Sequence, residues 1–218
     1  KFFTVLTSLG SKERLALSFR YMKDDPQNNI RVIPPLLRKE VTLHEPYSGD
    51  YIQGYMVNAG CSENVLKWHR QHPRIPLRFF WDKWEEEPVK RVENTLSFYQ
   101  LDDVEILRQM AGCKAYASTA GFESVCEAMY LGKPILMVPA HIEQDCNAYD
   151  AEKSGAGIIS SDFNLQQLLE FAKDYHPNRD FVYWVRGAEY TLLNLLESDS
   201  SNYQQVLFNE MYLVEEFI

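Results

Sequence analysis

Long apolar runs and excess basic charge are both missing from this 218-residue sequence. No run approaches the ~20 apolar residues of a membrane-spanning helix, so we expect no direct membrane insertion by this chain. Lys and Arg number 22 against 31 Asp and Glu, which gives a formal net charge of -9. A surface of that sign repels phosphate backbones and anionic lipid, so we also expect no nucleic-acid partner.

Cysteine is scarce as well, and its spacing excludes the common cysteine-based sites. The four cysteines are widely separated, form no Cys-x-x-Cys pair and lie in apolar contexts: Cys61, Cys113, Cys126 and Cys146. Free thiols in such contexts behave as small hydrophobic side chains. We therefore expect a reduced, cytoplasmic setting.

The histidines do not indicate a metal site either. His69, His72 and His141 stand apart without metal-ligand spacing, so each is interpreted as a surface or hydrogen-bonded core histidine. Lys133 could approach a phosphate, but its position at the start of a predicted strand favours a plain surface lysine. We expect no metal in this chain.

The sequence does contain a regular alternation of strand and helix patterns after Asp50. Short apolar runs predict strands at 50–57, 76–81, 93–99, 114–119, 133–140 and 157–160. Helical spacing predicts helices that begin near Ser62, with this serine as the cap, and near 101, 121 and 145. Each helical crossover returns the chain to the same sheet, so this order predicts an α/β fold with a Rossmann-like parallel sheet and flanking helices.

The two ends of the chain differ from this central pattern, and we expect three segments. Residues 1–49 open on an apolar, strand-prone run without an initiator Met, which predicts a remnant of, or linker to, a missing N-terminal domain. Residues 50–162 form the Rossmann-like domain. Residues 163–218 show helical spacing of apolar residues and predict C-terminal helices.

The run STAGFES, from Ser118 to Ser124, joins a predicted strand to a predicted helix. Its small residues let the backbone approach an oxygen-rich ligand, while Thr119 and Ser124 offer hydroxyl donors. A helix N-terminus adds roughly 0.3 to 1 kcal/mol for an anion, so a diphosphate would fit. The simpler alternative is a turn in which Ser or Thr caps the helix, and the run by itself favours that alternative.

Carboxylate and amide side chains cluster further along the chain. Glu127 could close a capping box with Ser124, or could accept hydrogen bonds from both hydroxyls of a ribose. After the strand at 133–140, four such groups crowd the start of the next helix: Glu143, Gln144, Asp145 and Asn147. Four groups exceed what a helix cap needs, and carboxylate plus amide suits bidentate contact with sugar hydroxyls.

In this order the residues resemble the donor-binding half of the two-domain GT-B glycosyltransferases. That group includes the UDP-glycosyltransferases and the bacterial GlcNAc transferase that makes a lipid-linked peptidoglycan precursor. Its signature reads approximately Thr-His-x-Gly-Trp-Asn-Ser-x-x-Glu, Gly-x-Pro, a Pro at a strand end, Asp or Glu followed by Gln, and Asn-Ala. The matches here are Ser118 to Ser124, Glu127, Gly132 to Pro134, Pro139, Glu143-Gln144 and Asn147-Ala148. The resemblance covers about Asp50 to Ser160.

The resemblance implies a role for each matching position. The donor diphosphate would contact Thr119, Gly121 and Ser124, with a second phosphate loop at Asn58 and Gly60. Glu127 would hold the ribose, Glu143 and Gln144 the transferred sugar or the ribose, and Phe98 and Tyr99 would flank the base through their backbone groups. Two positions depart from the signature. Thr119 stands where many relatives have His, and Glu123 stands where Asn is usual, where a carboxylate would repel phosphate unless it turns outward or meets a basic partner.

The resemblance also implies a mechanism. Transfer needs a general base for the acceptor hydroxyl and stabilisation of the departing nucleoside diphosphate. The helix start at Phe122 and the loop donors would supply the stabilisation without a metal or another cofactor. The general base belongs, in the family, to the N-terminal acceptor domain. We therefore expect a chain that binds a nucleotide sugar, most readily a uridine nucleotide, and does not complete transfer alone.

Two alternatives stay open on the sequence. A nucleotide-sugar 2-epimerase shares the fold and would take further acid and base residues from the missing half. A stand-alone donor-binding subunit would need a separate acceptor-binding partner. A purely structural module would leave the cluster of Glu127, Glu143 and Gln144 unexplained.

Overall fold

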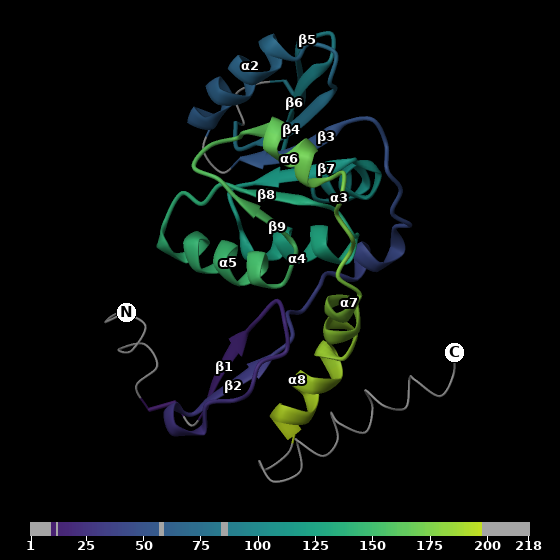
Figure 1. The fold of residues 1–218 in the computed structure, drawn as a ribbon. Coiled ribbons are helices and arrows are strands. Elements are labelled where there is room, and N and C mark those ends of the chain that lie inside the picture. The colour runs from purple at the N-terminus through teal and green to yellow at the C-terminus, as the bar shows by residue number, and fades with distance from the viewer. Residues whose placement is uncertain (1–9, 12, 57–58, 84–86, 198–218) are drawn as a thin grey trace. The chain divides into compact units, whose positions relative to one another are not determined.

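The computed structural model describes residues 10–11, 13–56, 59–83 and 87–197 (Figure 1). These residues form two compact units. The larger spans residues 37–182, and the smaller joins the described residues up to Leu36 with those from Tyr183 onward. The division at 49/50 and 162/163 stays a prediction.

A seven-stranded sheet is the centre of the larger unit. Its strands are β3 (Ile52–Met56), β4 (Leu77–Trp81), β5 (Val89–Glu93), β6 (Leu96–Gln100), β7 (Ala115–Ser118), β8 (Ile135–Met137) and β9 (Gly157–Ile159). Their order across the sheet is β5-β6-β4-β3-β7-β8-β9, and only β5 is antiparallel to its neighbour. The parallel Rossmann-like sheet predicted from the sequence is therefore confirmed.

The six parallel strands have the order of a doubly wound fold. From β3 the chain proceeds outward through β4 to β6, returns to β7 on the other side of β3, and proceeds outward again to β9. The order reverses between β3 and β7, so this pair forms the topological switch point. Ligands of doubly wound sheets bind beyond the carboxyl ends of the strands at such a point.

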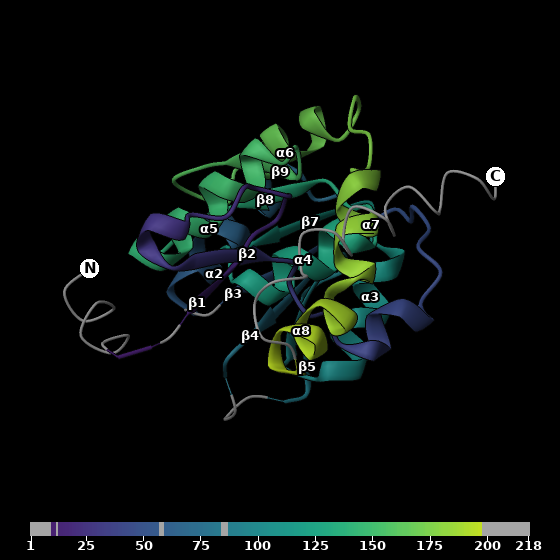
Figure 2. The ribbon, with the colours of Figure 1, turned by 90° about the horizontal axis from the view of Figure 1, so that it is seen from below.

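Helices cover both faces of the sheet. They are α2 (Ser62–Gln71), α3 (Asp103–Gly112), α4 (Phe122–Tyr130), α5 (Ile142–Lys153) and α6 (Leu165–Phe171), with short 3-10 helices at Lys39–Leu43 and Ala59–Cys61. Val65 of α2 and Leu165 of α6 share one core cluster with side chains of β3, β4 and β6. Figure 2, seen from below, shows α5, α4 and α3 in a row, and Figure 1 shows α4 and α5 on the side of the sheet opposite α2.

Local chemistry sets where several helices begin and end. The carboxylate of Asp102 accepts hydrogen bonds from the N–H groups of Val104 and Glu105 at 3.1 and 2.7 Å, which fixes the start of α3 as the sequence predicts. The predicted cap of α2 is wrong, because Cys61 occupies the N-cap position and Ser62 is already helical. Gly132 follows α4 at φ 66°, a left-handed conformation that glycine adopts without steric cost.

Aromatic side chains fill the core between the sheet and the helices α2 and α6. The indole of Trp81 stacks on Phe98 with ring centroids 4.4 Å apart, and Phe79 meets Phe163 edge-on at 5.7 Å. The ring of Phe79 also lies across Gly54, where an added Cβ would approach it to 2.1 Å. A glycine in β3 is therefore needed for the packing of β4.

The smaller unit contains a two-stranded parallel sheet and a helix. β1 (Arg14–Leu17) pairs with β2 (Ile30–Ile33), and a 3-10 helix at Pro26–Asn28 lies between them in the chain. The helix α7 (Arg179–Arg186) begins in the last residues of the larger unit and ends in the smaller one. The helix α8 (Ala188–Glu197) lies in the smaller unit and contacts β2. The indole N–H of Trp184 donates to the carbonyl of Ser18 at 3.0 Å. In the described ranges we find no helix with the length and apolar character needed to cross a membrane.

Candidate functional site

The predicted phosphate loops follow the two strands of the switch point. β7 ends at Ser118, and the loop of Thr119 to Gly121 leads into α4. β3 pairs with β7, and Gly60 lies exposed in the 3-10 helix that follows β3. Asn58 lies outside the described residues. The topology thus brings two segments, which are about 60 positions apart in the sequence, to the edge where doubly wound sheets bind ligands.

Two helices begin side by side at this edge without side-chain caps. β7 and β8 are neighbours in the sheet, and each leads directly into a helix, α4 or α5. The N-cap residues are Gly121 and His141, and neither makes a side-chain capping bond. By contrast, Asp102 caps α3 and Asn164 caps α6. Uncapped first turns direct backbone N–H groups and a partial positive charge toward any anion at their ends.

Ala120, just before α4, has a strained backbone. Its φ is 59°, a left-handed conformation that costs a non-glycine residue roughly 1–2 kcal/mol. Two hydrogen bonds hold it there: its N–H donates to Ser118 Oγ at 3.2 Å, and its carbonyl accepts from Asn147 Nδ2 at 3.3 Å. Such strain persists only where the surroundings enforce it, and it gathers at functional sites. The sequence gives no signal for it, since alanine rarely adopts this conformation.

Glu127 has an ionic partner that lies far away in the sequence. Its side chain is 5% exposed, and its Oε1 lies 2.6 Å from Nε of Arg38, which donates to it. The same guanidinium lies 3.5 Å from Asp103 at the start of α3. The hydrogen bond from Arg38 to Glu127 raises the pKa of Arg38, against the lowering effect of burial. This ion pair joins residues 89 positions apart.

The capping-box alternative for Glu127 is wrong. The helix α4 begins at Phe122 with Gly121 as its N-cap, so Glu127 lies inside the helix and Ser124 is not a cap. The hydroxyl of Ser124 instead donates to the carbonyl of Gly121 at 3.1 Å. Glu127 is therefore a buried carboxylate whose role is not to cap α4.

The other predicted sugar-binding residues lie at the start of α5. Gln144 is 6% exposed, and its Oε1 accepts the N–H of Ala140 at 2.8 Å, which fixes the turn between β8 and α5. Glu143 is exposed to solvent. Asn147, one turn further, connects α5 to the strained Ala120. Gln144 and Asn147, which both match the family signature, thus hydrogen-bond the backbone of the loops before α5 and α4.

Thr119 is more buried than its predicted role requires. Its side chain is 1% exposed, and its hydroxyl oxygen has no hydrogen-bond partner among the residues that the structure describes. A buried hydroxyl without a partner costs free energy. Direct contact between Thr119 and a diphosphate stays a prediction. It would require this buried hydroxyl to turn toward the edge of the sheet.

Phe98 and Tyr99 lie inside β6, within the strand that the sequence predicts at 93–99. β4 and β5 border this strand on its two sides, and Phe98 is 1% exposed against Trp81. The strands β4 and β3 lie between β6 and β7 in the sheet. The structure therefore does not place these two residues beside Glu127, and base recognition by their backbone groups stays a prediction.

Lys133 is not the surface lysine that the sequence predicts. It is 4% exposed, and its ammonium donates to the carbonyls of Tyr47, Ala111 and Cys113 at 2.7, 2.7 and 3.0 Å. It precedes β8, so it lies at the amino end of the strands, opposite the candidate site. Burial lowers the pKa of this lysine. Its role is to tie three backbone segments together rather than to bind phosphate.

His69 is a hydrogen-bonded core histidine, one of the two interpretations that the sequence allows. Its imidazole is fully buried between the carboxylate of Glu93 and the hydroxyl of Thr95, each 2.8 Å from a ring nitrogen. Across the described ranges, no three His, Cys, Asp or Glu side chains gather in a way that could hold a metal ion.

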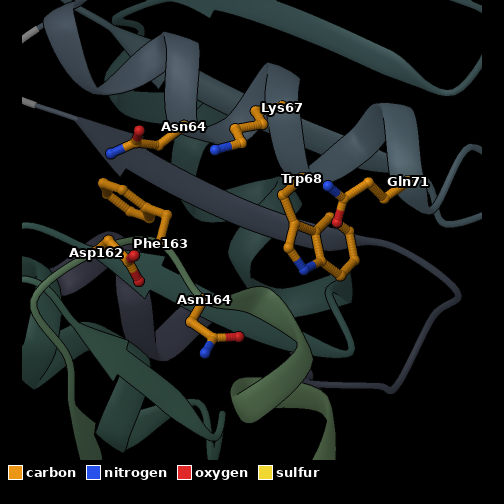
Figure 3. A pocket seen from close by; sticks show the side chains of 7 residues that line it. All are labelled: Asn64, Lys67, Trp68, Gln71, Asp162, Phe163 and Asn164. Carbon is orange, nitrogen blue, oxygen red and sulfur yellow. The ribbon is translucent and has the colours of Figure 1, made fainter.

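A small pocket lies apart from these residues. Its volume is about 200 Å³, and it is lined by Asn64, Lys67, Trp68, Gln71, Asp162, Phe163 and Asn164 (Figure 3). Figure 3 shows that the α2 side chains face the segment that leads into α6. None of the predicted donor residues lines it, and it is smaller than the 300–1,000 Å³ typical of sites for drug-sized ligands. We do not assign the donor to this pocket.

Comparison with known proteins supports a family assignment. A model of the family described as Glycosyl transferase family 1 matches residues 10–175. The putative UDP-glucuronosyltransferase ugt-48 of Caenorhabditis elegans is 26% identical over 105 residues, which cover 47% of this chain and 20% of that protein.

Solved structures share the fold at low sequence identity. The glycotransferase of kitacinnamycin matches with a TM-score of 0.54 and 13% identity, over 75% of this chain and 46% of that chain. Arabidopsis thaliana UGT89C1, complexed with UDP-L-rhamnose, matches with a TM-score of 0.50 and 16% identity, over 77% of this chain and 45% of that chain. The chain thus spans about half of these structures and a fifth of the worm protein. The match to the model of a glycosyl transferase family favours a glycosyltransferase over the epimerase alternative.

The family model and the fold agree on one assignment. The model covers more than half of the sequence, and the mostly parallel sheet with flanking helices matches the GT-B structures. The chain belongs to glycosyl transferase family 1 and has the fold of the GT-B glycosyltransferases.

Proposed function

We propose that this chain is the donor-binding part of a glycosyltransferase and that it binds a nucleoside-diphosphate sugar, with uridine as the nucleoside. The observation that carries the proposal is the pair of helix starts at α4 and α5. They lie at the ends of neighbouring strands beside the switch point, and neither has a side-chain cap. Two such N-termini together suit the two linked anionic groups of a diphosphate.

The side chains at this edge suit the rest of such a donor. Glu127 offers a buried carboxylate one helical turn beyond Ser124, which supports a role in accepting the ribose hydroxyls. Glu143 is exposed at the first turn of α5, where a transferred sugar would meet it. The uridine preference is supported by the UDP-sugar in the solved UGT89C1 structure.

The chemistry of transfer needs more than these groups. Departure of the diphosphate is assisted by the helix N-termini, which stabilise the charge that develops on the leaving oxygen without a metal ion. The general base for the acceptor hydroxyl is proposed to come from an acceptor domain, and the chain's coverage of about half of its solved relatives supports this. The present chain would then bind donor but not complete transfer alone.

Isothermal titration calorimetry with a panel of nucleoside diphosphates tests donor binding. We expect UDP to bind best, and binding to persist in EDTA. Glu127→Ala should weaken UDP binding roughly tenfold or more, since a hydrogen bond to a charged group contributes about 1.5–3 kcal/mol. The matched control is Glu170→Ala in α6, an exchange of the same kind at a carboxylate that hydrogen-bonds Gln166 on the surface. If the folded wild-type chain bound none of the panel, the proposal would be wrong.

The same titration tests the metal-independent mechanism separately. Loss of UDP binding in EDTA, with recovery on adding Mg²⁺, would contradict it while leaving donor binding intact. An acceptor-independent release of free sugar by this chain would contradict the placement of the catalytic base in another domain.

A further inference from the structure

Arg38 lies where the linker before β3 passes the candidate donor site. It precedes the 3-10 helix Lys39–Leu43, which contacts α3, and its guanidinium lies between α3 and α4. Its Nε donates to Glu127 at 2.6 Å, and its Nη1 lies 3.5 Å from Asp103. About a third of the Arg38 side chain is exposed, whereas that of Glu127 is 5% exposed, so the ion pair joins a buried carboxylate to a guanidinium that solvent reaches.

The geometry of this ion pair fixes the direction of the Glu127 carboxylate. An ionised carboxylate has about four acceptor positions on two oxygens, and Arg38 uses one of them on Oε1. The remaining positions, including those of Oε2, are left for other donors. A flexible Glu side chain held in one orientation loses less freedom when a ligand binds.

Arg38 also changes the charge that a ligand meets. It lies among three carboxylates, those of Glu127, Asp103 and Glu123, and the charge of each one raises its pKa. Glu123 is exposed in the first turn of α4, where its carboxylate would repel an anion unless it turns outward or meets a basic partner. The guanidinium of Arg38 pairs with Glu127 and Asp103, and its charge offsets part of the negative charge on this side of α4.

We propose that Arg38 is a positioning residue for donor recognition. It orients Glu127 so that the carboxylate accepts hydrogen bonds from the 2′- and 3′-hydroxyls of the donor ribose. The inference rests on the proposed donor-binding function and deepens it. It predicts that Arg38 governs discrimination between ribose and deoxyribose nucleotides, not only the affinity for nucleotides in general.

The test compares UDP with 2′-deoxy-UDP by calorimetry for the wild type and for Arg38→Gln. We expect the wild type to bind UDP roughly tenfold more tightly, because 2′-deoxy-UDP lacks one hydrogen bond to a charged acceptor. In Arg38→Gln this ratio should fall below about threefold. The matched control is Arg108→Gln, which removes an equal charge from the exposed pair of Arg108 with Glu105 on α3. It should leave the ratio unchanged.

A double-mutant cycle separates positioning from a general structural effect. If Arg38 acts through Glu127, adding Arg38→Gln to Glu127→Gln should not change the UDP to 2′-deoxy-UDP ratio further. Arg38→Lys keeps the positive charge but lacks the planar, two-pronged guanidinium, so its ratio of UDP to 2′-deoxy-UDP affinity should lie between those of the wild type and Arg38→Gln. This variant replaces Arg38→Gln in the test if Arg38→Gln does not fold. Circular dichroism of each variant confirms that the compared samples are folded.

Three outcomes would overturn the inference. Equal weakening of both nucleotides by Arg38→Gln and Arg38→Lys would reduce Arg38 to a structural role. Tighter UDP binding by Arg38→Gln would show that the arginine competes with the ribose for Glu127. A wild type that binds UDP and 2′-deoxy-UDP equally would show that Glu127 does not read the ribose, whereas a wild type that binds neither would reject the donor site itself.

Discussion

Replacing Lys133 by Met should destabilise the larger unit strongly. The ammonium is buried and donates to three backbone carbonyls, those of Tyr47, Ala111 and Cys113. It thereby joins the linker before β3, the end of α3 and the segment that enters β7. Methionine has a similar length and fills the same space, but it cannot donate a hydrogen bond.

The magnitude follows from the carbonyls that lose their partner. Ala111 keeps the N–H of Tyr47 as a donor at 2.9 Å, so its carbonyl stays satisfied. The carbonyls of Tyr47 and Cys113 lose the ammonium, and each lost bond to a charged donor costs roughly 1.5–3 kcal/mol. The variant no longer buries a charge, which offsets part of this cost. We expect the free energy of unfolding to fall by about 3 kcal/mol.

Urea unfolding, followed by tryptophan fluorescence and far-UV circular dichroism, measures this change. With a slope of about 2 kcal/mol per molar urea, the midpoint should fall by about 1.5 M. Lys114→Met at the neighbouring exposed lysine is the control, and its midpoint should stay within about 0.25 M of the wild type. A fall of less than about 0.5 M for Lys133→Met would refute the reasoning, because the carbonyls of Tyr47 and Cys113 would then not depend on the ammonium.

Three further predictions concern the packing, the loop and the pH dependence. Gly54→Ala should lower the free energy of unfolding by about 1–3 kcal/mol in the same assay, because its Cβ meets the ring of Phe79 at 2.1 Å; a neutral effect would mean that the ring moves freely. Asn147→Ala should weaken UDP binding several-fold by releasing Ala120 from its left-handed conformation, and unchanged calorimetric affinity would contradict this link. Burial raises the pKa of the Cys113 thiol to about 12. The stability that the buried neutral thiol contributes is therefore fully present below the ordinary pKa of a thiol, and it is lost as the pH rises through 12. The wild type should therefore lose more stability than Cys113→Ala between about pH 9 and 12, and parallel curves would exclude the thiol as a cause.

Hydrophobic patterning accounts for the part of the fold that the sequence predicts. Short buried runs such as 115–118 and 135–137 alternate with helices whose apolar side chains recur every three or four residues. That alternation is typical of parallel sheets, because the strands are buried on both faces. The sequence does not predict β5, because this strand lies exposed at the edge of the sheet and its sequence, Val-Lys-Arg-Val-Glu, has no apolar face. The order of strands also needed the structure, since the periodicity of each segment does not fix its neighbours.

Local order along the chain is enough to select some of the residues at the candidate site. Glu127, Glu143 and Gln144 are candidates because they follow consecutive strands at short intervals, and their contact with a donor stays a prediction. Arg38 was missed because it reaches Glu127 across 89 positions, and nothing in its own neighbourhood marks it as a partner. Lys133 was misassigned for the same reason, because its acceptors come from residues 20 to 86 positions away. Contacts of that range come from the tertiary fold and are not visible in local patterns.

The net negative charge of the chain does not conflict with a diphosphate ligand. The formal charge of -9 is spread over 218 residues, and at physiological ionic strength charges farther than about 8 Å from the ligand are largely screened. A long polyanion would meet many of these charges, whereas a diphosphate meets only the groups at one edge of the sheet. There, the uncapped starts of α4 and α5 supply the positive potential, and the guanidinium of Arg38 offsets part of the negative charge of the nearby carboxylates. Because this positive potential comes from backbone N–H groups, the site needs few basic residues, and an acidic sequence can form it.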